Sequence, residues 1–286
     1  MSFRVTEDRD VKLSAVLLAA AVTLIPSSSP VVSVAYAASL VSVMEGPVAR
    51  ALAERAGLSF AGEPKGSRAL ANLIRAGLRN PDVFISADPT LLNGLVEQYT
   101  IFGSARMVVA YSPKSAHASL FADAARGSVS ITAALRAPGV RVGRTDPAID
   151  PKGARTVRAV QLLAKHYHKP AFAQNLLASA QVFPEEDLAV RVQTGELDAG
   201  FFYSTETAPM GLPTVELPAG TNLANEIAFA IAILPHATHH QNAQTFLNFM
   251  LYGQGKRILE AAGLHFFNPV RVVVPPSPSI KGTPRI

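Results

Sequence analysis

Short apolar segments of strand character alternate with helical segments from Val31 onward, and this alternation constrains the fold more than any other feature. The expected elements of the first part are strands at 31–36, 58–61 and 82–86 and helices at 40–56, 68–78 and 90–97. Gly57 directly follows the first helix, where a glycine commonly ends a helix. Repeated strand–helix units predict parallel strands with helices on both faces of the sheet, which is an α/β fold.

The alternation continues in the second part of the chain. The expected elements there are strands at 107–111, 140–143, 199–203 and 228–234 and helices at 120–125, 130–136, 153–168, 241–251 and 256–262. The strands at 107–111 and 228–234 are alike in apolar character and bracket the middle unit, which indicates two lobes joined by two crossover segments. We expect lobe 1 at 31–106 and 226–286 and an inserted lobe 2 at 107–225, each a mostly parallel sheet flanked by helices. Such lobes would enclose a ligand cleft between them.

The N-terminal segment has the pattern of an export signal. Basic residues (Arg4, Arg9 and Lys12) precede the apolar run 13–25, and a Pro- and Ser-rich stretch follows at 26–30. The run is too short to span a membrane but suits a secretory signal peptide, which we place at 1–30; a buried amphipathic helix is the alternative. The chain has no cysteine, which excludes disulfides and a lipid-modified cysteine anchor. The sequence thus predicts a soluble periplasmic protein.

Composition narrows the function classes. The 286 residues are 49% hydrophobic and 16% charged, which excludes a disordered chain. The net charge of +5 is scattered and forms no polybasic run, so the sequence predicts no binding of nucleic acid, whereas a small anionic ligand suits the charge.

Enzyme signatures are absent from the sequence. There is no thiol nucleophile, G-x-S-x-G, HExxH, Walker A loop or dinucleotide fingerprint, so we expect neither an enzyme nor a cofactor. The histidines at 166, 168, 239 and 240 are interpreted as solvated side chains and not as a metal site.

Two serines follow the first two strands at positions where helices are expected to begin. Ser39 follows the strand at 31–36, and Ser67 opens the helical pattern after Gly66. A serine at a helix N-cap places its hydroxyl beside unpaired backbone N–H groups and the positive end of the helix dipole. Two such ends facing one cleft would bind a small oxyanion without a metal. The alternative is that each serine only caps its helix.

Two further candidates lie in the inserted lobe. Asp150, followed by Pro151 at a first helical position, can cap the long helix, contact a ligand, or do both. Beside a bound anion it would accept a hydrogen bond or bind the metal centre of an oxometallate. Tyr203 ends a strand and can donate its phenol to an oxyanion or to a local partner. Asp88 is interpreted as a helix cap.

With these residues in view, the chain resembles the periplasmic substrate-binding proteins of ABC importers, type II fold, and among them the molybdate/tungstate-binding WtpA/ModA-like branch. The motifs that carry the resemblance are Ala37-Ala38-Ser39-Leu40, Gly66-Ser67, residues 82–88, Asp150-Pro151-x-Gly153, residues 195–198, residues 244–250 and residues 258–264. Together they span about Val31 to Phe267.

The resemblance implies oxyanion contacts from Ser39 and Ser67 on one lobe and from Asp150 and Tyr203 on the other, with Ala38 and Gly66 as further contacts. Archaeal members supply a second carboxylate from a Phe-Glu-Tyr strand end, whereas this chain has Phe202 at that position. The departure favours a tetrahedral anion over six-coordinate binding. Glu206 could supply the second carboxylate only if its loop bends back.

The resemblance further implies a monomer that closes its two lobes around molybdate or tungstate and delivers the anion to the transmembrane subunits of an ABC permease. Sulfate, phosphate or an organic acid is the alternative ligand. An enzyme on the same fold would need a nucleophile or base in the cleft, and a regulator would need a DNA-binding helix pair.

Overall fold

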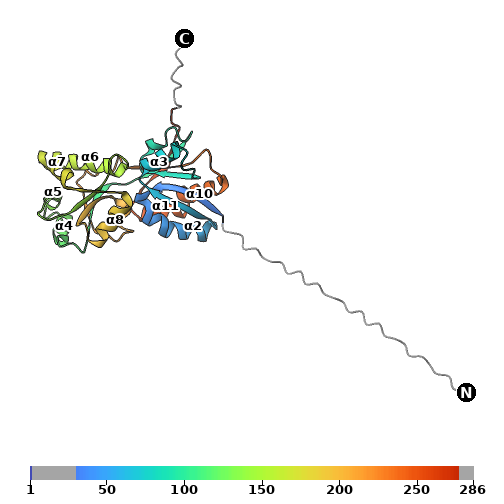
Figure 1. The fold of residues 1–286 in the computed structure, drawn as a ribbon, viewed down its shortest axis with the longest axis horizontal. Coiled ribbons are helices and arrows are strands. Elements are labelled where there is room, and N and C mark those ends of the chain that lie inside the picture. Colours follow the sequence, from blue (N-terminus) through green and yellow to red (C-terminus); the bar gives the residue numbers. More distant parts are fainter. Residues whose placement is uncertain (2–29, 277–286) are drawn as a thin grey trace, which may run out of the picture.

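The computed structural model describes Met1 and residues 30–276 and contains two β-sheets flanked by helices (Figure 1). The expected signal peptide falls, apart from Met1 and Pro30, outside the described residues. The first sheet has the order β11-β4-β10-β3-β1-β2 and the second the order β7-β6-β8-β5-β9. The two-lobed α/β architecture predicted from the sequence is confirmed.

The strands of the first sheet are β1 (Val31–Ala37), β2 (Ser59–Lys65), β3 (Val83–Ser86), β4 (Tyr99–Ser104), β10 (Ala228–Ile233) and β11 (His265–Val273). Those of the second are β5 (Met107–Tyr111), β6 (Val142–Thr145), β7 (Gln181–Phe183), β8 (Ala199–Tyr203) and β9 (Thr214–Glu216). The α-helices are α1 (Val41–Val43), α2 (Ala49–Ala56), α3 (Ser67–Arg75), α4 (Ala118–Ala125), α5 (Ile131–Ala134), α6 (Pro151–His166), α7 (Pro170–Ser179), α8 (Glu185–Thr194), α9 (Ser204–Thr207), α10 (His240–Tyr252) and α11 (Gln254–Ala261).

Both sheets are mixed, which corrects the expectation of mostly parallel sheets. In the first sheet β1 runs parallel to β2 and β3, but β10 runs antiparallel to β3 and β4. In the second, β6 runs parallel to β7 and β8, but β5 runs antiparallel to β8 and β9. The physical reason is the crossover: β5 and β10 enter their sheets from the other lobe, so they run opposite to strands that end at the lobe boundary.

The two crossover segments lie side by side. One comprises residues 105–106 between β4 and β5, and the other comprises residues 217–227 between β9 and β10. The backbone N–H of Ala105 donates to the carbonyl of Ile227 (3.1 Å), and that of Met107 donates to the carbonyl of Asn222 (2.7 Å). The connection between the lobes is therefore a pair of hydrogen-bonded segments.

Local sequence explains where the elements differ from expectation. The helix expected at 40–56 is broken into η1 (Ala38–Leu40), α1, a π-helical turn η2 (Met44–Val48) and α2, because Pro47 supplies no N–H inside it. Gly57 ends α2 with a φ of 60°, as predicted. The helix expected at 90–97 is only a 3-10 turn, η3 (Pro89–Leu92), because the chain reverses at Gly94, whose φ is 76°.

The second strand is longer than expected and fixes the position of the helix after it. β2 pairs with β1 in register from Val31–Ser59 to Ala37–Lys65, although it contains Pro64. A proline is tolerated there because β2 is the edge strand of its sheet.

Among the described residues, no helix combines the length and the apolar character that a membrane crossing demands.

Candidate functional site

The two predicted serines lie at the C-terminal ends of neighbouring parallel strands. Ala37 of β1 is the register partner of Lys65 of β2, and Ser39 and Ser67 each stand two residues beyond that pair. Neighbouring strands lie about 4.8 Å apart, so the two turns leave the sheet side by side. The side chains of both serines are buried, at 3% and 1% relative exposure.

The expectation that these serines are N-caps is wrong. The N-cap of η1 is Ala37 and that of α3 is Gly66, both with extended backbone, and neither helix has a side-chain cap. Ser39 lies inside η1 and Ser67 is the first residue of α3. Because the hydroxyls do not cap their helices, the alternative that each serine serves only as a cap is excluded.

The hydroxyls of the two serines remain able to donate. Oγ of Ser39 is buried and has no hydrogen-bond partner within residues 30–276. Oγ of Ser67 accepts a hydrogen bond from the backbone N–H of Ala87 at 3.1 Å, which leaves its own proton free to be donated. Ala38, buried beside Ser39, opens η1, where backbone N–H groups have no intrahelical acceptor.

Asp150 performs the predicted capping role with one oxygen only. It is the N-cap of α6, its Oδ1 accepts from the backbone N–H of Lys152 at 3.0 Å, and Pro151 occupies the first helical position. Oδ2 is buried and has no partner. Burial raises the pKa of Asp150 above its ordinary value, although the charge of Lys152 and the hydrogen bond from its backbone N–H oppose this rise. Half of this carboxyl group is therefore available to a ligand.

Tyr203 ends β8, as predicted, and its phenol has no hydrogen-bond partner in the part of the chain that the structure describes. The alternative that a local group satisfies this hydroxyl is therefore wrong. Burial, followed by the charges of Asp150 and Glu185, raises the pKa of Tyr203 well above its usual value, so the phenol keeps its proton. It can act as a hydrogen-bond donor at any physiological pH.

Sequence reasoning missed two threonines of the same kind. Thr145 ends β6, Thr205 lies in α9 directly after β8, and the hydroxyls of both are buried without a partner. A polar residue where a parallel strand ends is the signal that could have identified them, because ligands gather at that edge of an α/β sheet.

The two lobes are in contact at these residues. Two segments of lobe 1 contact helices of lobe 2: η1 packs against α8 and α9, and β2 packs against α8. A methyl group at Gly66 would lie 3.1 Å from the carbonyl oxygen of Ile149 and 3.5 Å from Cβ of Asp150. Nζ of Lys65 lies 4.0 Å from Oε1 of Glu186. The structure thus brings the first lobe's glycine–serine turn against the second lobe's Asp150 turn.

A buried ion cluster lies beneath the Asp150 turn. Nζ of Lys152 contacts Oε1 of Glu185 at 3.0 Å and Oε1 of Glu206 at 2.7 Å, and its side chain is fully buried. Oε2 of Glu206 accepts from the backbone N–H of Tyr203 at 2.6 Å. The Phe202 ring lies 5.2 Å below Nζ. Glu206 does bend back toward the strand end, but both of its oxygens are engaged, and no local sequence pattern indicates Lys152 as a partner of this glutamate.

The remaining candidates have structural roles. Asp88 caps η3, as predicted: its Oδ1 accepts from the backbone N–H of Thr90 at 3.0 Å. Within residues 30–276, no group of three or more His, Cys, Asp or Glu side chains could hold a metal ion.

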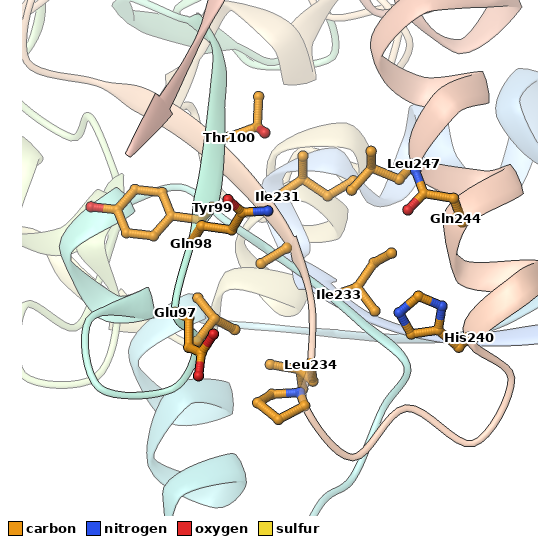
Figure 2. Close-up of a pocket in the computed structure, with 13 residues that line it drawn as sticks. Glu97, Gln98, Tyr99, Thr100, Ile231, Ile233, Leu234, His240, Gln244 and Leu247 are labelled. Atoms are coloured by element: carbon orange, nitrogen blue, oxygen red, sulfur yellow. The ribbon is translucent and has the colours of Figure 1, made fainter. Parts of the chain in front are cut away.

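A surface hollow of about 620 Å³ lies at the far end of the first lobe (Figure 2). The residues that line it include Glu97, Tyr99, Ile231, His240 and Gln244. Ile233, at this end of β10, pairs with Val83 at the start of β3, whereas the serines follow the strand ends at the opposite edge. None of the predicted site residues lines this hollow.

Comparisons with known proteins agree with this architecture. The model of a family described as bacterial extracellular solute-binding protein matches residues 32–265. A Haloferax volcanii protein, provisionally named ABC transporter molybdenum-binding protein, is 36% identical over 165 residues, which are 57% of this chain and 53% of that protein. The chain thus spans about half the length of that relative.

Two further matches cover a larger share of the matched protein's own length. The molybdate/tungstate-binding protein WtpA of Thermococcus kodakarensis is 24% identical over 264 residues, covering 74% of each chain. The solved periplasmic molybdate-binding protein of Azotobacter vinelandii superposes with a TM-score of 0.63 at 20% identity, over 82% of this chain and 98% of that one. This last likeness concerns the fold.

Proposed function

Because the chain belongs to the family of bacterial extracellular solute-binding proteins, we propose that it captures a tetrahedral oxyanion between its lobes and delivers it to an ABC permease. Molybdate or tungstate is the foremost candidate, since relatives named for these anions match the chain. Sulfate, phosphate or a small organic acid is the alternative. The proposal is for binding without catalysis.

One observation carries this proposal: buried hydroxyl groups from both lobes lack any hydrogen-bond partner among the described residues. They belong to Ser39 of the first lobe and to Thr145, Tyr203 and Thr205 of the second. A buried polar group without a hydrogen bond costs about 1–3 kcal/mol. An anion whose oxygens accept from several of these hydroxyls removes that cost, and its charge is matched by the backbone N–H groups at the starts of η1 and α3.

Binding would close the lobes by a hinge motion at the two crossover segments, residues 105–106 and 217–227. An anion that contacts Ser39 and Ser67 on one side and Tyr203 on the other binds the closed form better than the open form, and this difference drives closure. Gly66 favours closure because it presents no side chain to Ile149 and Asp150.

Export is part of the proposal. The pattern at residues 1–30 is that of a cleaved signal peptide, which would release a monomeric receptor into the periplasm. The permease that would receive the anion is a membrane protein of the ABC importer class.

Calorimetry of the purified protein with molybdate, tungstate, sulfate and phosphate tests the proposal. We expect at least one of these anions to bind, and the double substitution Ser39→Ala and Ser67→Ala to weaken binding at least tenfold. Ser179→Ala, at a serine of α7 whose hydroxyl donates to the carbonyl of Leu176, is the matched control and should leave the affinity unchanged. An affinity of the double variant within twofold of the parent contradicts the assignment of the cleft.

A further inference from the structure

The proposed anion site lies beside more negative than positive buried charge. Asp150, Glu185 and Glu206 are buried at 4–6% relative exposure, and the fully buried cation among them is Lys152. Three carboxylates facing one cleft would repel an anion strongly, because charges in a site of low dielectric are poorly screened. An anion receptor with this composition needs a device that keeps the acids from the ligand.

The contacts of Lys152 are such a device. The side chain leaves the first turn of α6, directly after the Asp150 cap, and runs inward to Glu185 of α8 and Glu206 of α9 at 3.0 and 2.7 Å. The second oxygen of Glu206 is engaged by the backbone N–H of Tyr203 at 2.6 Å. Both oxygens of Glu206 are thus occupied on the protein side, whereas Oδ2 of Asp150 is unpaired.

We infer that Lys152 is a positioning residue that holds Glu185 and Glu206 away from the bound anion, so that Asp150 is the carboxyl that faces it. This inference rests on the proposed function and narrows its ligand class. With both oxygens of Glu206 engaged, the cleft suits an oxyanion whose central atom keeps its four oxygen neighbours and is held by hydroxyl and N–H donors. A second carboxylate to raise a molybdate or tungstate centre to six-coordination is not offered by Glu206.

The decisive variant is Glu206→Gln, which removes the charge of Glu206 and preserves its shape. Lys152 retains Glu185 as its partner, so the fold keeps its ion pair and the cleft becomes less negative. We expect anion affinity within threefold of the parent or tighter. Glu226→Gln, at a glutamate whose ion pair with Arg158 is exposed, is the matched control for loss of one negative charge. A tenfold or greater loss in Glu206→Gln overturns the inference, because it means that Glu206 contacts the ligand.

Removal of the lysine provides the complementary test. Lys152→Met frees two carboxylates beside the cleft, and we expect at least a tenfold loss of anion affinity. The triple variant Lys152→Met, Glu185→Gln and Glu206→Gln removes the charges together and should restore affinity to within threefold. Should Lys152→Met fail to fold, the triple variant and Glu206→Gln still decide the question. A folded triple variant that binds no anion overturns the inference, since Lys152 would then contact the ligand itself.

X-ray absorption spectroscopy of the protein loaded with tungstate, or with molybdate if that binds better, gives an independent readout. Four oxygen neighbours around the metal in the parent and in Glu206→Gln are expected, and six neighbours overturn the inference. Different outcomes contradict the proposed function and the role of Lys152. A parent protein that binds none of the four anions defeats the proposed function together with this inference, whereas binding that is lost in Glu206→Gln defeats the inference alone.

Discussion

Two buried aspartates, Asp82 of the first lobe and Asp198 of the second, differ sharply in their hydrogen bonding from Asp150 at the proposed anion site. We call Asp82 and Asp198 the framework aspartates. Asp82, at the start of β3, is fully buried and accepts hydrogen bonds from the backbone N–H and the hydroxyl of Ser33 and from the backbone N–H of His239. Asp198, before β8, accepts from Arg141 and from the hydroxyl of Ser115. Where the lobes meet, one oxygen of Asp150 is unpaired among the described residues, and so are the hydroxyls of Ser39 and Tyr203.

The hydrogen bonds of the framework aspartates stabilise the fold, whereas one oxygen of Asp150 is left unpaired among the described residues. Burial alone would raise the pKa of each framework aspartate, but hydrogen bonds outweigh burial and lower the pKa of Asp82 below its usual range and that of Asp198 to about 2. At Asp150 burial prevails, and the pKa is raised. Unsatisfied polar atoms in a well-bonded protein indicate a place for a ligand.

The largest expected effect is the loss of stability when a framework aspartate is removed. Asp82→Ala deprives the backbone N–H groups of Ser33 and His239 and the hydroxyl of Ser33 of their buried acceptor, and we expect it to lower the free energy of unfolding by about 3 kcal/mol. Urea unfolding measures this change. The matched control is Asp88→Ala, which removes a partly exposed helix cap and should cost about 1 kcal/mol. Equal losses in the two variants would contradict the framework role, and anion affinity of the folded Asp82→Ala protein should be unchanged.

The second effect is acid sensitivity. The pKa of Asp198 is about 2 in the folded protein, against about 3.9 in an unfolded chain. Its contribution to the free energy of unfolding, about 2.6 kcal/mol, is therefore complete above about pH 5 and is lost as the pH falls through 4 toward 2. Urea unfolding at several pH values between 7 and 2 measures this slope. Asp198→Asn should flatten the curve in that window, and an unchanged slope would contradict the assignment.

The smallest effect concerns closure of the cleft. Gly66→Ala places a methyl group 3.1 Å from the carbonyl oxygen of Ile149, which obstructs the closed form, whereas its backbone (φ −52°) accommodates alanine in the open form. We expect anion affinity to fall about tenfold, or about 1.4 kcal/mol, with little change in the stability of the ligand-free protein. Calorimetry and small-angle scattering measure affinity and closure. Gly46→Ala, where no atom lies within 4 Å of the added methyl group, should change neither property.

Much of the fold could be predicted from local pattern. The apolar runs at 107–111 and 199–203 are β5 and β8 with the predicted bounds, and Gly57 ends α2 in the left-handed conformation. The strands β4, β7, β9 and β11 were not recognised. β11 contains Pro269 and has a mostly exposed face, so it lacks the continuous apolar run that marks a buried strand.

The candidate site was only partly accessible to the same reasoning. Ser39, Asp150 and Tyr203 were identified because each stands where a strand ends or a helix begins. The states of their side chains were not accessible, because a sequence does not tell whether a hydroxyl caps a helix or stays unpaired. Thr145, Thr205 and the partnership of Lys152 with Glu206, 54 residues away along the chain, depend on which strand ends meet.

The sequence by itself determined the alternation of strands and helices, the helix ends at glycine and proline, and the polar residues at the strand ends, because each depends on neighbours within a few residues. The tertiary structure alone decided the mixed strand directions, the contact of Gly66 with the Asp150 turn, and the capture of Glu206 by Lys152. These features join segments distant in the chain, and hydrogen bonding and charge act on separation in space.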